Sequence, residues 1–224
     1  MAEERLYDNL LALPLFQGMS RSDLAMVAGQ TKFDFHKFSD GKIVAKEGDP
    51  CRHFRFLLKG ELMVESFSDD YAYRVVEDIS APEIIQPEHL FGLHQRYTRN
   101  YTTKGDCNMM QLDKKEVLKL TNQYEIFRLN LLNIVATQTQ KANHRVWRKA
   151  PEEVRDHIIR FFESHCTRPA GEKMFYIKMR RLAVEVNDSR LDVSKALNEL
   201  QEQGLIELFR GRIHIPALEK LLME

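Results

Sequence analysis

The sequence predicts an α+β protein with a β-rich first half, one long helix, and a smaller C-terminal domain of helices and a short hairpin. Three observations support this fold class. Residues 32–113 hold short runs of strand-forming residues separated by glycines. Residues 114–149 contain neither glycine nor proline and carry a helical repeat of apolar residues. Residues 178–215 have the pattern of two short helices around a tight turn, followed by two strand-like runs.

The size and composition are those of a two-domain globular protein. A chain of 224 residues is longer than one small helical core needs, and 43% hydrophobic with 29% charged residues is ordinary for a soluble chain. No apolar run approaches the roughly 20 residues that cross a bilayer. The N-terminus lacks the basic-then-apolar pattern of a signal peptide. We therefore expect a cytoplasmic protein with no membrane partner.

Charge and cysteine content narrow the function classes further. The 33 basic and 33 acidic residues cancel, which excludes a uniformly basic protein but leaves room for a local basic face. Cys51, Cys107 and Cys166 lie far apart, without the paired spacing of a disulfide framework or a metal site. We expect buried, reduced thiols and no metal. We also expect no enzyme, since the sequence offers no nucleophile–base set and no phosphate-binding loop.

The first half is predicted to be a β-sandwich or β-roll that follows short leading helices. The stretch KFDFHKF, residues 32–38, alternates aromatic and polar residues as a half-buried strand does. The stretch HFRFLLKGELMVESF, residues 53–67, predicts two strands with a turn at Lys59 and Gly60. Short strands at such regular glycine spacing are typical of all-β domains.

Residues 114–149 predict one long helix that needs a partner. Its apolar side chains follow heptad spacing, which predicts a dimer interface in a twofold-symmetric homodimer. The residues of this predicted interface are Tyr124, Phe127, Leu131, Ile134 and Gln138. The alternative is that the helix packs partly on its own β-domain, since a second apolar row is available in Ile126, Leu129, Leu132 and Val135.

The stretch DSRLDVSKALNELQEQGLI, residues 188–206, predicts a helix with a marked start and end. Ser189 is placed to cap the first turn, with Asp192 three residues later. Gly204 stands where a helix commonly ends in the left-handed conformation. The buried stripe is predicted to be Val193, Ala196, Leu197 and Leu200.

The residues before and after this helix predict a winged helix-turn-helix. KMRRLAVEV, residues 178–186, forms a first short helix, and Asn187 can take the left-handed conformation that the turn requires. LIELFRGRIHI, residues 205–215, predicts a hairpin around Arg210 and Gly211.

In a helix-turn-helix the second helix enters the major groove, so its polar side is predicted to face DNA. Arg190 and Lys195 offer donors to guanine or phosphate, and Leu191 offers an apolar contact to a thymine methyl group. The alternative is that this side of the helix is exposed to solvent and binds nothing. The full set of predicted DNA-binding residues is Arg180, Arg181, Ser189, Arg190, Leu191, Ser194, Lys195 and Arg212.

The order of these parts resembles the bacterial Crp/Fnr-type transcription regulators, named for the cyclic-AMP receptor protein and the fumarate and nitrate reduction regulator. LLALPLFQGMSRSDLAMVA resembles the leading helices of that family, and FSDGKIVAKEGDPCRHFRFLLKGELMV resembles its β-roll. SRLDVSKALNELQEQGLI with RGRIHI resembles its recognition helix and wing.

The resemblance implies a cupin-like β-roll sensor over residues 1–113, a dimerisation helix over 114–149 and a winged helix-turn-helix over 150–224. It further implies a homodimer on a pseudo-palindromic duplex, with an unknown small-molecule effector and RNA polymerase as partners to be tested. The family's recognition pattern Ser-Arg-Glu-Thr-Val-Ser-Arg here stands as SRLDVSK, residues 189–195. Leu191 replaces the glutamate and removes an acceptor for cytosine, so a different operator is expected.

The family's cyclic-nucleotide cassette is altered in this chain. The resemblance implies Glu88, Arg99 and Asn100 as effector-binding residues, but Gln86 and Pro87 stand where the family has Gly-Glu. Proline offers no N–H to a phosphate. The pattern favours a roll that kept its fold and lost or changed its ligand, with no cofactor. The alternative function is a cyclic-nucleotide-binding signalling module whose C-terminal helices contact proteins.

Overall fold

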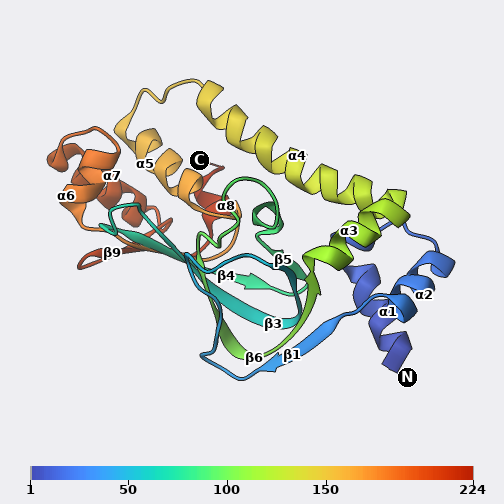
Figure 1. Ribbon diagram of the computed structural model, residues 1–224. Helices are drawn as coiled ribbons and strands as arrows, with labels where there is room; N and C mark the ends of the chain where they lie inside the picture. Colours follow the sequence, from blue (N-terminus) through green and yellow to red (C-terminus); the bar gives the residue numbers. More distant parts are fainter. Residues whose placement is uncertain (1, 224) are drawn as a thin grey trace. The chain divides into compact units, whose positions relative to one another are not determined.

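The computed structural model describes residues 2–223, which form two compact units (Figure 1). The first unit consists of Met1–Leu62 with Ile79–Val146, and the second of Met63–Asp78 with Trp147–Glu224. The second unit therefore contains the predicted winged helix-turn-helix and also a segment from the β-rich half. No helix within the described residues is both long and apolar enough to span a membrane.

The first unit opens with short helices that cover its core. They are α1 (Ala2–Ala12), the 3-10 helix η1 (Pro14–Phe16) and α2 (Arg21–Gln30). The Ser20 hydroxyl caps α2 by accepting the Asp23 N–H at 3.0 Å. Phe16 is fully buried and its ring centroid lies 5.2 Å from that of Phe127.

Antiparallel strands form the roll of the first unit. They are β1 (Asp34–Phe38), β2 (Ile43–Ala45), β3 (His53–Phe67), β5 (Glu83–Ile85) and β6 (Asn100–Asp113). β6 pairs with β1 and β2, and β3 pairs with β5.

The predicted turn at Lys59 and Gly60 is wrong, because β3 runs without interruption through both residues. Gly60 has a φ of +100°, and a Cβ there would lie 2.7 Å from the Asp106 carbonyl oxygen and from the Cys107 Sγ. The glycine is needed for close approach between strands and not for a turn.

The predicted single helix is two helices, α3 (Lys114–Gln123) and α4 (Glu125–Trp147). Tyr124 between them is extended, with φ −122° and ψ 108°. The residues before the break favour it, since Thr121 and Asn122 have low helix propensity and the Thr121 hydroxyl donates to the Leu118 carbonyl at 2.8 Å.

The second unit packs helices on a small antiparallel sheet. Its helices are α5 (Val154–His165), α6 (Met179–Glu185), α7 (Arg190–Glu202) and α8 (Leu218–Leu221). Its strands are β4 (Arg74–Ser80), β7 (Lys173–Tyr176), β8 (Glu207–Phe209) and β9 (Arg212–Ile215), in the order β4-β7-β9-β8. Phe161, Phe162 and Phe175 stand in one apolar cluster with the buried residues of α6 and α7.

Candidate nucleic-acid interface

The turn between α6 and α7 has the geometry that the sequence predicts. Asn187 is left-handed, with φ 56°, and the Asp188 N–H donates to the Ala183 carbonyl at 3.0 Å. The Ser189 hydroxyl accepts the Asp192 N–H at 3.1 Å and donates to the Asp192 carboxylate at 2.6 Å. Ser189, predicted to bind DNA, thus already uses its hydroxyl to cap α7.

Helix α7 separates into a buried and an exposed face. Val193 and Leu197 are fully buried, with Ala196 and Leu200 beside them, so the predicted buried stripe is confirmed. Arg190, Leu191 and Lys195 are exposed, Leu191 by 81%, and Ser194 is half-buried. The helix ends as predicted, because Gly204 has a φ of 72° and the Leu205 N–H donates to the Leu200 carbonyl at 3.0 Å.

The predicted wing is an antiparallel hairpin of β8 and β9. Phe209 pairs with Arg212 across the Arg210–Gly211 turn, and Gly211 has a φ of +75°. The Arg212 guanidinium carbon lies 4.7 Å from the Phe209 ring centroid, which holds this exposed cation at the wing.

His214 at the base of the wing lies between two carboxylates. Its Nδ1 is 3.0 Å from the Glu207 Oε2 and its Nε2 is 2.8 Å from the Glu172 Oε1. Both partners are acceptors, so both contacts are hydrogen bonds only when the ring is an imidazolium. The hydrogen bond with Glu207 is the main cause that raises the pKa of His214, and Glu172 adds to it.

The two arginines of α6 differ. Arg180 is exposed. Arg181 is half-buried and paired, since its Nη2 lies 2.6 Å from the Glu185 Oε1 and 2.9 Å from the Asp70 Oδ2. The sequence predicts both as DNA-binding residues, but only Arg180 stands open to a phosphate.

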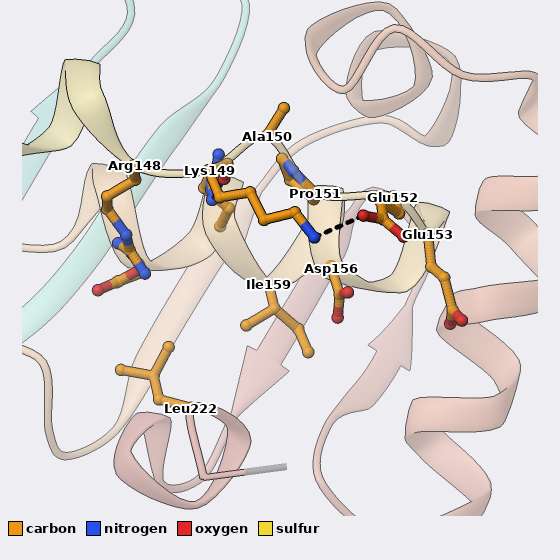
Figure 2. Close-up of a pocket in the computed structure, with 11 residues that line it drawn as sticks. Arg148, Lys149, Ala150, Pro151, Glu152, Glu153, Asp156, Ile159 and Leu222 are labelled. Carbon is orange, nitrogen blue, oxygen red and sulfur yellow. Dashed lines mark hydrogen bonds and ion pairs between the residues drawn. The ribbon is translucent and has the colours of Figure 1, made fainter.

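A cavity of about 490 Å³ lies where the chain enters α5 (Figure 2). Its lining cations are already engaged. Lys149 is paired with Glu152 at 2.6 Å, and Arg148 is paired with Glu163. Arg160 donates to the Lys149 carbonyl. The Arg148–Glu163 ion pair and the Arg160 hydrogen bond attach the segment before α5 to that helix, and each of the three lining cations already has a partner.

His157 links this segment to the helix-turn-helix. Its Nε2 lies 3.1 Å from the Pro151 carbonyl and its Nδ1 lies 2.7 Å from the Asp188 Oδ2. Both are acceptors, so this ring too must be an imidazolium to donate at both nitrogens. The bond to Asp188 is the main cause that raises the pKa of His157.

In the stretch that holds the predicted effector residues, the side chains of Gln86 and Asn100 are hydrogen-bonded to other parts of the protein. Gln86, 4% exposed, donates from its Nε2 to the Thr98 Oγ1 at 2.6 Å, and the Thr98 N–H donates to the Gln86 Oε1 at 3.0 Å. The Asn100 Oδ1 accepts the Glu47 N–H at 2.8 Å. No pattern in the sequence indicates a role for Thr98.

Two other effector candidates are only partly accessible. Glu88 lies in the 3-10 helix η2 (Pro87–His89), with its Oε1 3.7 Å from the His89 Nε2. Arg99 is half-buried.

Two residues of the predicted dimer stripe are buried by their own unit. Phe127 is fully buried and Leu131 is 9% exposed within a single chain, so their own unit already covers these two side chains. Tyr124 and Ile134 are half-buried and Gln138 is exposed. The apolar row that stays exposed, by 37–58%, is the second one: Ile126, Leu129, Leu132 and Val135.

The three cysteines are each buried and free of disulfides. The predicted burial of the three side chains is confirmed.

Comparison with known families gives two matches along the chain. Residues 35–124 match the cyclic nucleotide-binding domain, and residues 157–223 match the Crp-like helix-turn-helix domain. A comparison with curated protein sequences gives no match.

Solved structures share the fold. The catabolite activator protein of Thermus thermophilus is 19% identical, with a TM-score of 0.54 over 95% of this chain and 97% of its own. The c-di-GMP-responsive global regulator CLP of Xanthomonas campestris is 17% identical over 82% of this chain and 94% of its own, with a TM-score of 0.47. The sensor domain of the regulator DNR of Pseudomonas aeruginosa is 16% identical over 59% of this chain and 91% of its own, with a TM-score of 0.48. With a β-roll, a Crp-like helix-turn-helix and both family matches in chain order, the chain belongs to the Crp/Fnr-type transcription regulators.

Proposed function

We propose that this protein is a cytoplasmic, homodimeric regulator that binds a pseudo-palindromic duplex through two copies of α7, one helical turn apart in adjacent major grooves. The observation that carries the proposal is the exposed side of α7. Arg190, Leu191 and Lys195 project there from a helix that is capped at both ends and anchored by its buried stripe. A helix held this way presents its polar side with little freedom to turn.

The exposed residues suit a mixture of base and backbone contacts. Arg190 lies in the first turn, where a recognition helix meets base edges, and its guanidinium suits the O6 and N7 atoms of guanine. Leu191, 81% exposed, suits a thymine methyl group. Arg180 and Arg212 suit phosphates on either side.

A second copy of the chain is the proposed partner of α4. The exposed row Ile126, Leu129, Leu132 and Val135 is an apolar surface that a monomer leaves in water. Twofold symmetry lets this row pack on its own copy. The pairing would also set the distance between the two α7 helices.

The roll is proposed to have lost the cyclic-nucleotide ligand. Support comes from the mutual bonding of Gln86 with Thr98 and of Asn100 with the Glu47 N–H, because a phosphate would have to displace these bonds. Pro87 is buried and has no N–H to donate.

Selection of bound sequences from a random duplex library by the full chain tests the proposal. We expect an enriched palindrome whose half-sites are about 10 base pairs apart, centre to centre. Sedimentation of the free protein is expected to show a dimer. Cyclic nucleotides are expected to leave the affinity unchanged. Recovery of random sequences only, together with tight cyclic-nucleotide binding, would instead favour the signalling module.

A further inference from the structure

The second unit contains a hairpin from the β-rich half of the chain. This hairpin, Met63–Asp78, comprises the end of β3, a turn and most of β4. β4 pairs antiparallel with β7, from Arg74 opposite Tyr176 to Glu77 opposite Lys173. The sheet that underlies the helix-turn-helix therefore takes a strand from residues nearly a hundred positions upstream.

The hairpin contributes side chains to the core of this unit. Tyr73 and Val75, 9% and 2% exposed, belong to the same apolar cluster as Leu182 of α6 and Val193 of α7. The Tyr73 ring centroid lies 5.5 Å from that of Phe161. The domain core is thus incomplete without the hairpin.

A buried ion pair fixes the hairpin against β7. The Lys173 Nζ lies 2.8 Å from the Glu77 Oε2, and both side chains are 1% exposed. The second oxygen of Glu77 accepts the Thr167 N–H at 2.8 Å. Two charges so deeply buried are tolerated only when each is paired and hydrogen-bonded, so a shift in strand register would be costly.

The hairpin turn also holds the first helix of the helix-turn-helix. Asp70 binds Arg181 of α6 at 2.9 Å, and the Arg181 guanidinium carbon lies 5.8 Å from the Tyr73 ring centroid. Asp70 is itself fixed by the Ser68 hydroxyl at 2.8 Å and the Ala72 N–H at 3.1 Å. These two bonds, with Arg181, hold the pKa of Asp70 below its usual value.

We propose that the hairpin Met63–Asp78 is a positioning element of the DNA-binding surface, in which Asp70 and Tyr73 hold α6 in place through Arg181. This inference rests on the proposed function. Arg181 then acts as the anchor of α6 and not as a phosphate ligand, and the phosphate contact falls to Arg180. The alternative role of this contact is restraint, in which the ion pair with Asp70 keeps Arg181 from binding the duplex.

The two roles, positioning and restraint, predict opposite changes in DNA affinity for Asp70→Ala in the full chain. Positioning predicts that binding to the selected duplex weakens about two- to fivefold, the size of one exposed ion pair, with the salt dependence unchanged. Arg181→Ala is expected to give the same loss, and the double variant no further loss. Arg180→Ala is the contrasting control, since losing a phosphate contact reduces the salt slope by about one.

Asp69→Ala is the matched control, because it removes the same charge from the same turn. If Asp69→Ala weakens binding as much as Asp70→Ala, the effect is one of general charge and the proposal is overturned. Tighter binding by Asp70→Ala with a steeper salt dependence would establish restraint in its place. Additive losses in the double variant would also contradict a shared role.

Hydrogen exchange separates failure of this inference from failure of the proposed function. In the free full chain, the amides of residues 74–77 are expected to exchange together with those of residues 173–176 and 182–186. If the hairpin amides exchange independently of those in β7 and α6, the hairpin does not position α6, whether or not the protein binds DNA. If the wild type binds no DNA but exchange is shared, the proposed function alone fails.

Discussion

Helix α7 and the cassette stretch Gln86–Asn100 differ in the hydrogen-bond partners of their polar side chains, as Gln86, Thr98 and Asn100 show. On α7, Arg190 and Lys195 are exposed above a buried apolar stripe. In the cassette stretch, Gln86 and Thr98 bond to each other, and Asn100 bonds to the backbone of Glu47. A solvated side chain exchanges only water for a ligand, whereas a bonded one must first lose a protein partner. A ligand at Arg190 or Lys195 would displace only water, whereas a ligand at Gln86 or Asn100 would have to displace a hydrogen bond of the protein.

The same contrast separates the two neighbouring arginines of α6. Arg180 is exposed, while Arg181 is held by Glu185 and Asp70. Residue type alone makes both look like phosphate ligands. The partner of each side chain, and not its charge, decides which one is available.

The largest expected effect comes from removing the support beneath the α7 surface. Leu197→Ala should lower the free energy of unfolding by about 2–5 kcal/mol, because Leu197 is fully buried and truncation leaves a cavity. Leu191→Ala, the matched control on the exposed side, should leave it within about 0.5 kcal/mol. Urea denaturation measures both. Equal losses would mean that α7 lacks the two-faced character on which the comparison depends.

In the cassette, Thr98→Val should destabilise the first unit by about 1–3 kcal/mol, since the Nε2 of the buried Gln86 loses its acceptor. Thr102→Val, a half-buried threonine on β6, is the control for the change of side chain. Chemical denaturation gives the stability, and calorimetry tests whether the vacated amide now binds a cyclic nucleotide. If Thr98→Val leaves the stability unchanged, the hydrogen bonds between Gln86 and Thr98 do not hold the cassette in this conformation.

The sequence predicted best those features whose causes are local. The Ser189 cap, the Asn187 turn, the Gly204 end and the wing all depend on residues within a few positions of each other, and the structure has each of them. Caps and turns depend on short polar side chains and on the φ that a residue can adopt, so a short stretch of sequence is enough to predict them.

Features that depend on distant residues were not predictable in this way. Gly60 has the appearance of a turn residue, but the crowding that requires it comes from Asp106 and Cys107 on β6. Heptad spacing predicts Phe127 and Leu131 in a dimer interface, with packing on their own β-domain as the alternative, and within a single chain their own unit buries both. The pairing of β4 with β7 joins residues nearly a hundred positions apart, and neither strand's pattern names its partner.

Arg190→Ala tests whether the exposed side of α7 contacts bases. We expect a loss of about 1–3 kcal/mol on the selected duplex and relaxed preference at one base pair per half-site, because Arg190 is assigned to guanine. Arg180→Ala should weaken selected and random duplexes alike. Binding isotherms on both duplexes give the four affinities. If both variants lose the same affinity for both duplexes, the assignment of Arg190 to bases and Arg180 to the backbone is wrong.

The smallest expected effect is a pH dependence in the second unit. His157 and His214 each have a raised pKa in the folded protein, so the stability they contribute is fully present below their unfolded pKa, near 6.5. It is lost as the pH rises through the higher folded values. The melting temperature of the wild type should therefore fall over that window, beginning just above pH 6.5.

His214→Gln should flatten part of this fall, and His157→Gln another part, while His144→Gln on the exposed surface of α4 serves as the control. Thermal melts of the full chain between pH 6 and 9 measure the three profiles. Because His157 bonds to Asp188 beside the α7 cap, its loss should also make DNA affinity less dependent on pH, whereas changes in the cassette should not. A wild-type profile that rises with pH would mean that the two rings are neutral, and that their contacts with Asp188 and Glu207 are not those of an imidazolium.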